Sequence, residues 1–150
     1  RENLPKLKYK ARIEVMNPMI PGLEGEKMSA SIESSKIDLL DDEETVNNKV
    51  KNAYCEAGVV EGNGILAFLK YVIMTIKSDK GEKFKVGRDK KYGGDLVFNN
   101  YEDVENAFLN KKLHPLDLKN AVAFEINNLL KPVRKNMKIL KKLSKEAYGV

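Results

Sequence analysis

The 150-residue sequence contains one cysteine, one histidine and no tryptophan, and the first two shortages each exclude a class of structure. The single cysteine, Cys55, permits no internal disulfide, so we expect a reducing, cytoplasmic environment and a thiol that acts as a small buried hydrophobe. His114 alone leaves no residues with the spacing of zinc ligands, and we expect no metal site in this chain. No apolar run approaches the roughly 18 residues of a membrane span, so we expect no membrane partner.

The start of the chain also lacks the apolar stretch of a secretory signal, although it carries basic residues. Residues 11–16, ARIEVM, alternate apolar and polar side chains, which predicts a short strand. A strand without neighbours would leave both of its edges unpaired. We therefore expect its partner strands to precede Arg1, and the sequence to be part of a longer protein.

The net charge of +5 is distributed in blocks. Residues 22–61 carry four lysines and ten acidic residues, whereas residues 70–92 carry eight basic and three acidic residues. Residues 131–150 carry seven basic residues and one glutamate. Such basic blocks suit a polyanion such as RNA, but solvated helix faces explain them more often, so charge alone does not choose a partner.

From residue 41 onward, hydrophobic periodicity predicts a helix that Asp41 or Asp42 caps and that ends before Gly58. Its inner face is expected to comprise Val46, Val50, Ala53 and Tyr54. The acidic run 41–44 is better explained by capping and by the helix dipole than by metal binding.

A second helix is predicted over Gly64–Ile76, which is apolar nearly all round and should lie in the core. Residues 83–88 and 95–99 alternate in polarity and predict a small hairpin. Asn100, with an acid three residues later, predicts the start of a further helix.

The last periodic region begins at His114 and Pro115, which are expected at the N-cap and first position of a helix. Its apolar stripe comprises Leu118, Val122, Ile126, Leu129 and Val133. Pro132 should kink or end this helix, although the apolar stripe continues through Met137 and Leu140.

A candidate functional motif lies in the segment GEKMSAS, residues 25–31, on a long stretch without helical periodicity. A lysine ammonium and hydroxyl donors can stabilise the negative charge that develops on the departing oxygens of a triphosphate. A five-residue motif of this kind is, by itself, more often a solvent-exposed loop. Its surroundings in the sequence therefore decide the interpretation.

The stretch MNPMIPGLEGEKMSAS resembles the signature loop of class I aminoacyl-tRNA synthetases, whose pattern is Lys-Met-Ser-Lys-Ser. The stretches SKIDLLDD, KVKNAYCE, GNGILAFLKYV and LHPLDLKNAV resemble the cytosolic tyrosyl-tRNA synthetases of eukaryotes and archaea. The resemblance implies a mainly α chain in two parts. Residues 1–34 would end a Rossmann-type catalytic domain with its last strand and signature loop, and residues 35–150 would form a helical anticodon-binding domain.

The same resemblance implies an activity and its partners. ATP, with Mg²⁺, would activate tyrosine as an adenylate, and the aminoacyl group would pass to tRNA(Tyr). The full-length protein would be a cytoplasmic homodimer, and this portion alone would be inactive. The family's other signature, His-x-Gly-His, needs two histidines, so the tyrosine pocket and the other half of the ATP site are expected on other sequence.

Carried over residue by residue, the signature occupies Lys27, Met28, Ser29, Ala30 and Ser31. Lys27 is expected to contact the ATP phosphates, with Ser29 and Ser31 in supporting catalytic roles.

Ala30 stands where many class I enzymes have a second lysine, and the eukaryotic and archaeal tyrosine enzymes resemble this sequence in having a small residue there. Lys36 or a metal ion could supply the missing charge.

At the other end of the chain, the resemblance implies that HPLDLKN, residues 114–120, reads the first anticodon base. Asp117 is the candidate reader because a carboxylate can accept hydrogen bonds from adjacent donors on guanine, a bidentate pair that gives about 1–3 kcal/mol of discrimination. Tyr92 and His114 are candidates to stack on splayed bases, and Lys119 is a candidate phosphate contact.

Structural explanations exist for the same residues. Asp117 at the third position of a helix would favour the helix dipole, His114 could merely cap that helix, and Tyr92 could pack beside two glycines. A tryptophanyl-tRNA synthetase fragment is the nearest alternative family, although AYCE and HPLDLKN argue against it. A non-catalytic RNA-binding helical module is the alternative from another functional class.

Overall fold

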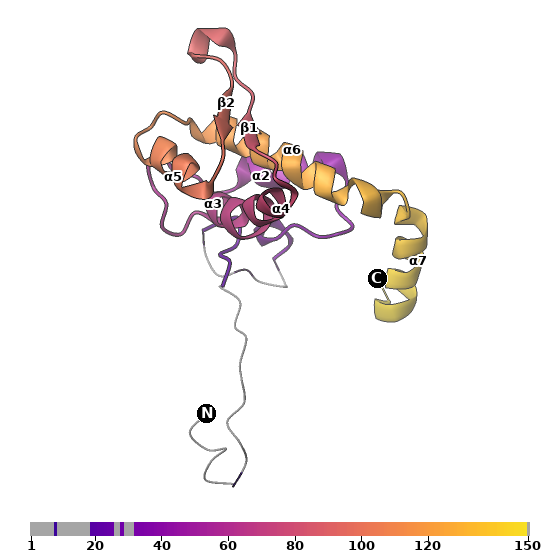
Figure 1. Ribbon diagram of the computed structural model, residues 1–150. Helices are drawn as coiled ribbons and strands as arrows, with labels where there is room; N and C mark the ends of the chain where they lie inside the picture. Colours follow the sequence, from indigo (N-terminus) through magenta and orange to yellow (C-terminus); the bar gives the residue numbers. More distant parts are fainter. Residues whose placement is uncertain (1–7, 9–18, 26–27, 29–31, 150) are drawn as a thin grey trace.

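The computed structural model describes residues 8, 19–25, 28 and 32–149. Within these ranges the chain is mainly helical, with one antiparallel pair of strands, which confirms the mainly α class (Figure 1). The predicted strand 11–16 lies outside the described residues. In chain order the elements are η1 (Glu33–Ser35), α2 (Glu43–Asn52), α3 (Gly64–Phe68), η2 (Leu69–Ile73), α4 (Met74–Lys80), β1 (Phe84–Val86), η3 (Lys90–Tyr92), β2 (Leu96–Phe98), α5 (Tyr101–Leu109), α6 (Pro115–Arg134) and α7 (Met137–Tyr148).

Helix α2 begins as the sequence predicts. The Asp42 carboxylate accepts a hydrogen bond from the Thr45 backbone N–H at 2.8 Å, which caps the helix. Val46 and Val50 are buried where α2 packs against α6. The predicted inner position of Tyr54 is wrong: α2 ends at Asn52 and Ala53 leaves the helical conformation, so the Tyr54 ring leaves the helical stripe and is 41% exposed.

The predicted helix Gly64–Ile76 is present but continues to Lys80, as the consecutive segments α3, η2 and α4. The middle segment, η2, is a π-helix. The extension was missed because residues 77–80 are polar. Lys77 is nevertheless buried, and its ammonium pairs with Glu125 of α6 at 2.9 Å, so the extra turn is held by a long-range ion pair.

The predicted hairpin is confirmed by β1 and β2, which pair in antiparallel register with Phe84 opposite Phe98. The two rings stack with centroids 6.5 Å apart. Phe84 and Val86 enter the core, which anchors the base of the hairpin. The connection that contains η3 projects away from the helices (Figure 1).

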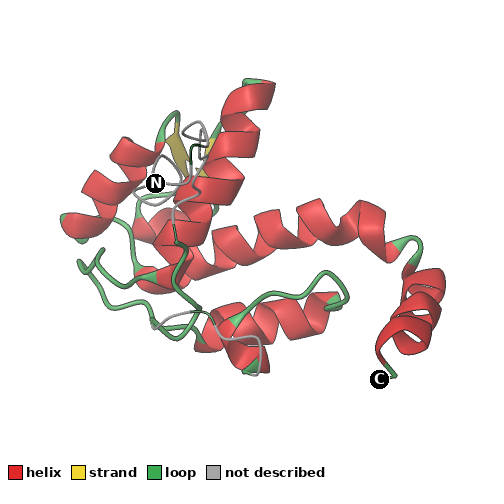
Figure 2. Cartoon of the chain, turned by 90° about the horizontal axis from the view of Figure 1, so that it is seen from below, coloured by secondary structure: helices red, strands yellow, loops and turns green. Residues whose placement is uncertain are grey.

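Helix α6 runs through the centre of the fold (Figures 1 and 2). The His114 ring nitrogen Nδ1 accepts a hydrogen bond from the Leu116 N–H at 3.1 Å, so His114 caps the helix as predicted. Leu118, Val122 and Ile126 are buried, and α6 contacts α2, η2 and β1. Twenty residues give a length of about 30 Å, so α6 links distant parts of the surface.

Pro132 lies inside α6, which ends two residues later at Arg134. This agrees with the expected effect of a proline that lacks an N–H donor and crowds the preceding turn. The helix α7 that follows turns away from α6 in both views (Figures 1 and 2). Its apolar side chains Ile139 and Leu143 are exposed. Among the described residues, no helix combines the length and apolarity that a bilayer crossing requires.

The buried cap residue Asn63 provides a test of this packing. Its carboxamide accepts from the Leu66 N–H at 3.1 Å and donates to the Val59 carbonyl at 3.1 Å. Asn63→Ala removes the cap and leaves the partly buried Val59 carbonyl without its donor, so we expect the free energy of unfolding to fall by about 2–3 kcal/mol in urea denaturation followed by circular dichroism.

The control for Asn63→Ala is Asn100→Ala. Asn100 also caps a helix, by accepting from the Asp103 N–H at 2.8 Å, but it is exposed. Its removal should cost about 1 kcal/mol. Equal losses for the two variants would contradict a structural role for Asn63 beyond capping.

Candidate functional site

The signature segment is only partly described. The side chain of Met28 is exposed, whereas Lys27, Ser29, Ala30 and Ser31 lie outside the described residues. The roles expected for these residues therefore stay predictions, and the structure bears on the segments that flank them.

Two residues that flank the signature segment are joined to each other. The Leu23 N–H donates to the Ser35 carbonyl at 2.9 Å, and the Tyr54 N–H donates to the Leu23 carbonyl at 2.7 Å. The Leu23 side chain is buried in the same core as Val46 and Val50. The chain on both sides of the signature is thus anchored to the helical part of the fold.

Close packing of two glycines supports this anchor. A Cβ atom on Gly64, at the start of α3, would overlap the carbonyl oxygen of Gly22 and contact the Cα atom of Leu23. Only hydrogen fits between these backbone segments. Leu23 was missed at the sequence level because a single leucine among glycines and acidic residues has no periodicity that would signal burial.

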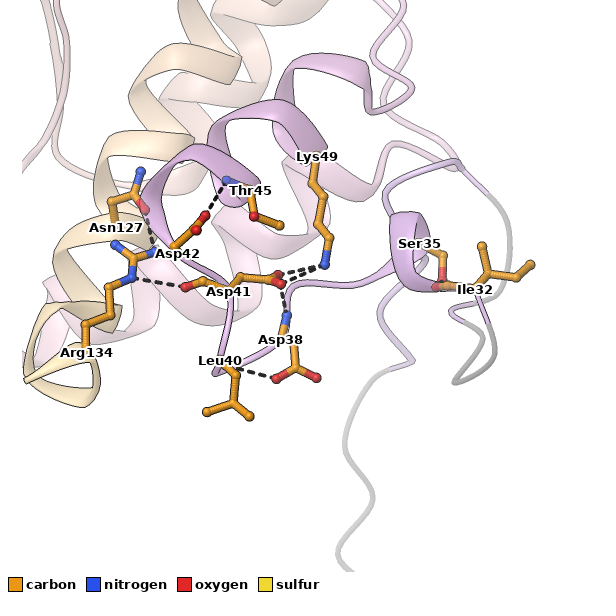
Figure 3. Close-up of polar contacts among 10 residues, drawn as sticks. All are labelled: Ile32, Ser35, Asp38, Leu40, Asp41, Asp42, Thr45, Lys49, Asn127 and Arg134. Atoms are coloured by element: carbon orange, nitrogen blue, oxygen red, sulfur yellow. Dashed lines mark hydrogen bonds and ion pairs between the residues drawn. The ribbon is translucent and has the colours of Figure 1, made fainter. Parts of the chain in front are cut away.

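The acidic residues that precede α2 form a network of polar contacts (Figure 3). The Asp41 carboxylate accepts from the Asp38 N–H at 2.8 Å and pairs with the Lys49 ammonium at 2.7 Å. Hydrogen bonding by Thr45 lowers the pKa of Asp42 below its usual value. Asp42 therefore caps α2, as the sequence predicted for this run, whereas the ion pair of Asp41 with Lys49 was not predicted.

The far end of α6 holds the same segment. The Arg134 guanidinium donates through Nε to the Asp41 carbonyl at 3.0 Å and through Nη2 to the Asn127 side chain at 2.8 Å (Figure 3). Nothing in the local sequence signals this contact, which joins residues 93 positions apart. It fixes the entry to α2 against the C-terminal end of α6.

Cys55 is half-buried, so the expected burial of its side chain is only partial. Burial raises the pKa of its thiol above the usual value. The Asn63 carboxamide lies 3.5 Å from the sulfur. The thiol thus lies beside a structural cap.

The residues proposed to read the anticodon occupy two neighbouring segments. His114 and Tyr92 are exposed, and Asp117 is half-buried at the third position of α6. The Lys91 ammonium lies 4.8 Å from the centroid of the Tyr92 ring. In the described part of the chain, the Tyr92, His114 and Asp117 side chains make no hydrogen bond or ring contact with one another.

Arg88 connects these two segments. Its guanidinium donates to the Gly94 carbonyl and, across the fold, to the Lys112 carbonyl, each at 3.0 Å. The loop that carries Tyr92 is thereby tied to the turn that precedes His114. From the sequence, Arg88 was expected only as part of the hairpin segment 83–88 and of a basic block.

Lys119 makes a contact that the sequence did not predict. Its ammonium donates to the Lys51 carbonyl at 3.0 Å, in the last turn of α2, where backbone carbonyls lack partners within the helix. Lys119 therefore joins α6 to α2. A phosphate contact by this residue stays a prediction.

Comparison with known proteins identifies the family. A family model described as "tRNA synthetases class I (W and Y)" matches residues 1–131. The chain belongs to this family. It is similar to the cytoplasmic tyrosine–tRNA ligase of Danio rerio, with 48% identity over 97% of this chain and 27% of the relative. The corresponding enzyme of Saccharomyces cerevisiae is 45% identical over 99% of this chain and 40% of the relative.

A solved structure gives the same assignment for this synthetase chain. The tyrosyl-tRNA synthetase of Archaeoglobus fulgidus, determined with L-tyrosine, matches with a TM-score of 0.79 and 44% identity, over 91% of this chain and 41% of that one. The chain thus belongs with the tyrosyl-tRNA synthetases, and the tryptophanyl alternative is not favoured. It spans about a quarter to two fifths of the length of these relatives.

The glycine contact beside Leu23 provides a test of the anchor. Gly64→Ala should displace the Gly22–Leu23 backbone from α3. We expect the free energy of unfolding to fall by about 1–3 kcal/mol, the usual cost of overpacking a core. Because the Leu23 and Tyr54 amides donate the anchoring hydrogen bonds, we expect their hydrogen exchange to accelerate. NMR-detected exchange measures both.

Gly87→Ala is the control for Gly64→Ala, since the nearest atom to an added Cβ there is 4.0 Å away. It should leave the Leu23 and Tyr54 exchange rates unchanged. Similar exchange in the Gly64→Ala variant and the parent would show that the anchor does not depend on this contact.

Proposed function

We propose that this chain is the C-terminal part of a tyrosine–tRNA ligase. In the complete enzyme, the tyrosine carboxylate attacks the α-phosphate of ATP, pyrophosphate leaves, and the resulting tyrosyl group passes to the 3′ end of tRNA(Tyr). The observation that carries the proposal is the 45–48% identity to tyrosine–tRNA ligases over nearly the whole chain. The two contributions of this part are a signature loop for ATP and a surface for the anticodon.

The proposed role of Lys27 is to bring a positive charge to the ATP phosphates as pyrophosphate departs. Ser29 and Ser31 add hydroxyl donors, and Mg²⁺ enters with ATP as part of the substrate. A donor that acts mainly in the transition state lowers the activation barrier by about 3–4 kcal/mol. The hydrogen bonds at Leu23 and Ser35 support this proposal, because they hold both ends of the segment that carries the signature against the helical part of the fold.

The proposed role of Asp117 is to accept hydrogen bonds from the Watson–Crick edge of the first anticodon base. Its place in the first turn of α6 supports the proposal, because the rigid helix fixes the carboxylate, which remains partly accessible. The exposed rings of Tyr92 and His114 are suited to stack on a splayed loop base. The capping bond made by His114 orients its ring without burying it.

The remaining features of the proposed enzyme are its location, its assembly and its division into domains. We propose that the complete protein works in the cytoplasm, as the names of the eukaryotic relatives state for those proteins. We also propose that it functions as a homodimer and that this part alone does not activate tyrosine. The proposed division into residues 1–34 and 35–150 assigns the signature loop to the catalytic domain.

A first test replaces the signature lysine in the complete enzyme. Lys27→Ala should slow tyrosine activation, measured by pyrophosphate exchange, by about 10²–10³-fold because a transition-state donor is lost. Lys27→Arg should retain part of the rate. Lys85→Ala, which removes an exposed lysine from the hairpin, is the control and should match the parent. Full activity of the Lys27→Ala enzyme would refute the catalytic role.

A second test separates anticodon reading from activation. Asp117→Ala should lower the charging efficiency of tRNA with guanine at the first anticodon position by about five- to hundredfold, while pyrophosphate exchange is unchanged. Asp103→Ala removes an acid from the same position of α5 and controls for the helix dipole. Equal charging by Asp117→Ala and Asp103→Ala enzymes would exclude a reading role for Asp117.

A further inference from the structure

A groove with a volume of about 780 Å³ lies between α2 and α6. It is lined along α6 from Leu116 in the first turn to Arg134 at the end, a distance of about 27 Å. Four cationic side chains and five asparagines line it, against one acid, Glu43. The groove is therefore a long, positively charged surface rich in hydrogen-bond donors.

Part of this polar lining holds the two helices together. Lys119 donates to the Lys51 carbonyl, and the Asn127 carboxamide donates to that of Asn47 at 2.9 Å. Arg134 donates to Asn127 and to the backbone at the start of α2. These contacts form a framework between α2 and α6. The donors of Lys119, Asn127 and Arg134 are therefore already engaged, at least in part, within the protein.

Other polar groups of the groove have no such use. The side chains of Lys51, Lys131, Asn120 and Asn128 are exposed, and within the described residues none of them makes a hydrogen bond or an ion pair. Two ammonium groups and two carboxamides thus face solvent along one groove. A chain of phosphate and ribose oxygens would satisfy them.

An exposed aromatic ring lies on the same side of α6. Phe124 lines the groove and is 65% exposed, although a phenyl ring gains from burial. Asp117, Phe124 and Lys131 recur every seven residues, so they share one side of the helix at intervals of about 10.5 Å. Asp117 does not itself line the groove, but it follows the lining residue Leu116 and shares a side of α6 with Phe124 and Lys131, so the groove leads to the carboxylate proposed to read the anticodon.

We propose that the groove between α2 and α6 binds the ribose–phosphate backbone of the RNA strand adjoining the base that Asp117 reads. Lys51 and Lys131 contact phosphates, and Phe124 stacks on a base or packs on a ribose. This inference rests on the proposed function, and it shifts the phosphate contact from Lys119, which is engaged in the framework, to two unengaged lysines. Continuity with Asp117 favours RNA over an acidic protein segment as the occupant.

The test measures binding of an anticodon stem-loop RNA to the 150-residue chain by fluorescence anisotropy between 50 and 200 mM salt, conditions in which phosphate contacts are resolved. The Lys51→Ala/Lys131→Ala variant should bind more weakly by about tenfold or more, and the slope of log K against log salt should fall by about 2. Phe124→Ala should weaken binding by about fivefold or more without a change in the slope.

The matched control is Lys138→Ala/Lys145→Ala, which removes two exposed lysines from α7 and should leave affinity and slope unchanged. Circular dichroism verifies that all variants are folded. Equal losses in the control would overturn the proposal, because general charge would then explain the binding.

Asp117→Ala in the same assay separates this inference from the proposed function. If Asp117→Ala weakens binding but the Lys51/Lys131 and Phe124 variants match the parent, the anticodon role stands and the groove inference fails. If the groove variants lose affinity and Asp117→Ala does not, the groove inference holds and base reading by Asp117 fails. A second titration replaces the RNA with polyglutamate. If every variant binds the RNA like the parent, but the Lys51→Ala/Lys131→Ala variant binds polyglutamate more weakly than the parent, an acidic protein would replace RNA as the occupant.

Discussion

Burial of one side of α6 is the interaction on which the rest of the structure depends. Leu118, Val122 and Ile126 are removed from water between α2, η2 and β1, and each such side chain contributes about 1.5–3 kcal/mol. Because these residues recur along the helix, their burial fixes the rotation of α6. The opposite residues are thereby directed to solvent and to the groove along α2.

The fixed orientation of α6 gives its two ends different tasks. At the first turn, His114 caps the helix and Asp117 remains accessible, which suits the proposed contact with an anticodon base. At the last turn, Arg134 donates a hydrogen bond to the carbonyl of Asp41, ten residues after the end of the proposed ATP signature at Ser31. A single rigid helix of about 30 Å thus connects the proposed RNA-reading surface to the segment between the signature loop and α2.

Local patterns predicted the elements well because caps and periodicity are local properties. Asp42, Asn100 and His114 each cap a helix as the sequence indicates, and the alternating segments pair as a hairpin. Long-range contacts account for the failures. The helix that ends at Lys80 depends on the pairing of Lys77 with Glu125, and no local pattern indicates that pair.

The candidate site was predictable only where its residues belong to a motif. The signature and HPLDLKN were found by resemblance, whereas the anchor at Leu23 and the meeting of cations from α2 and α6 in one groove have no signal in the local sequence. The most direct measurement is the change in backbone amide shifts of the ¹⁵N-labelled chain on titration with the tRNA(Tyr) anticodon stem-loop. We expect the largest changes around Tyr92, in residues 114–117 and along the groove face of α6. Changes confined to α7, or no changes, would contradict it.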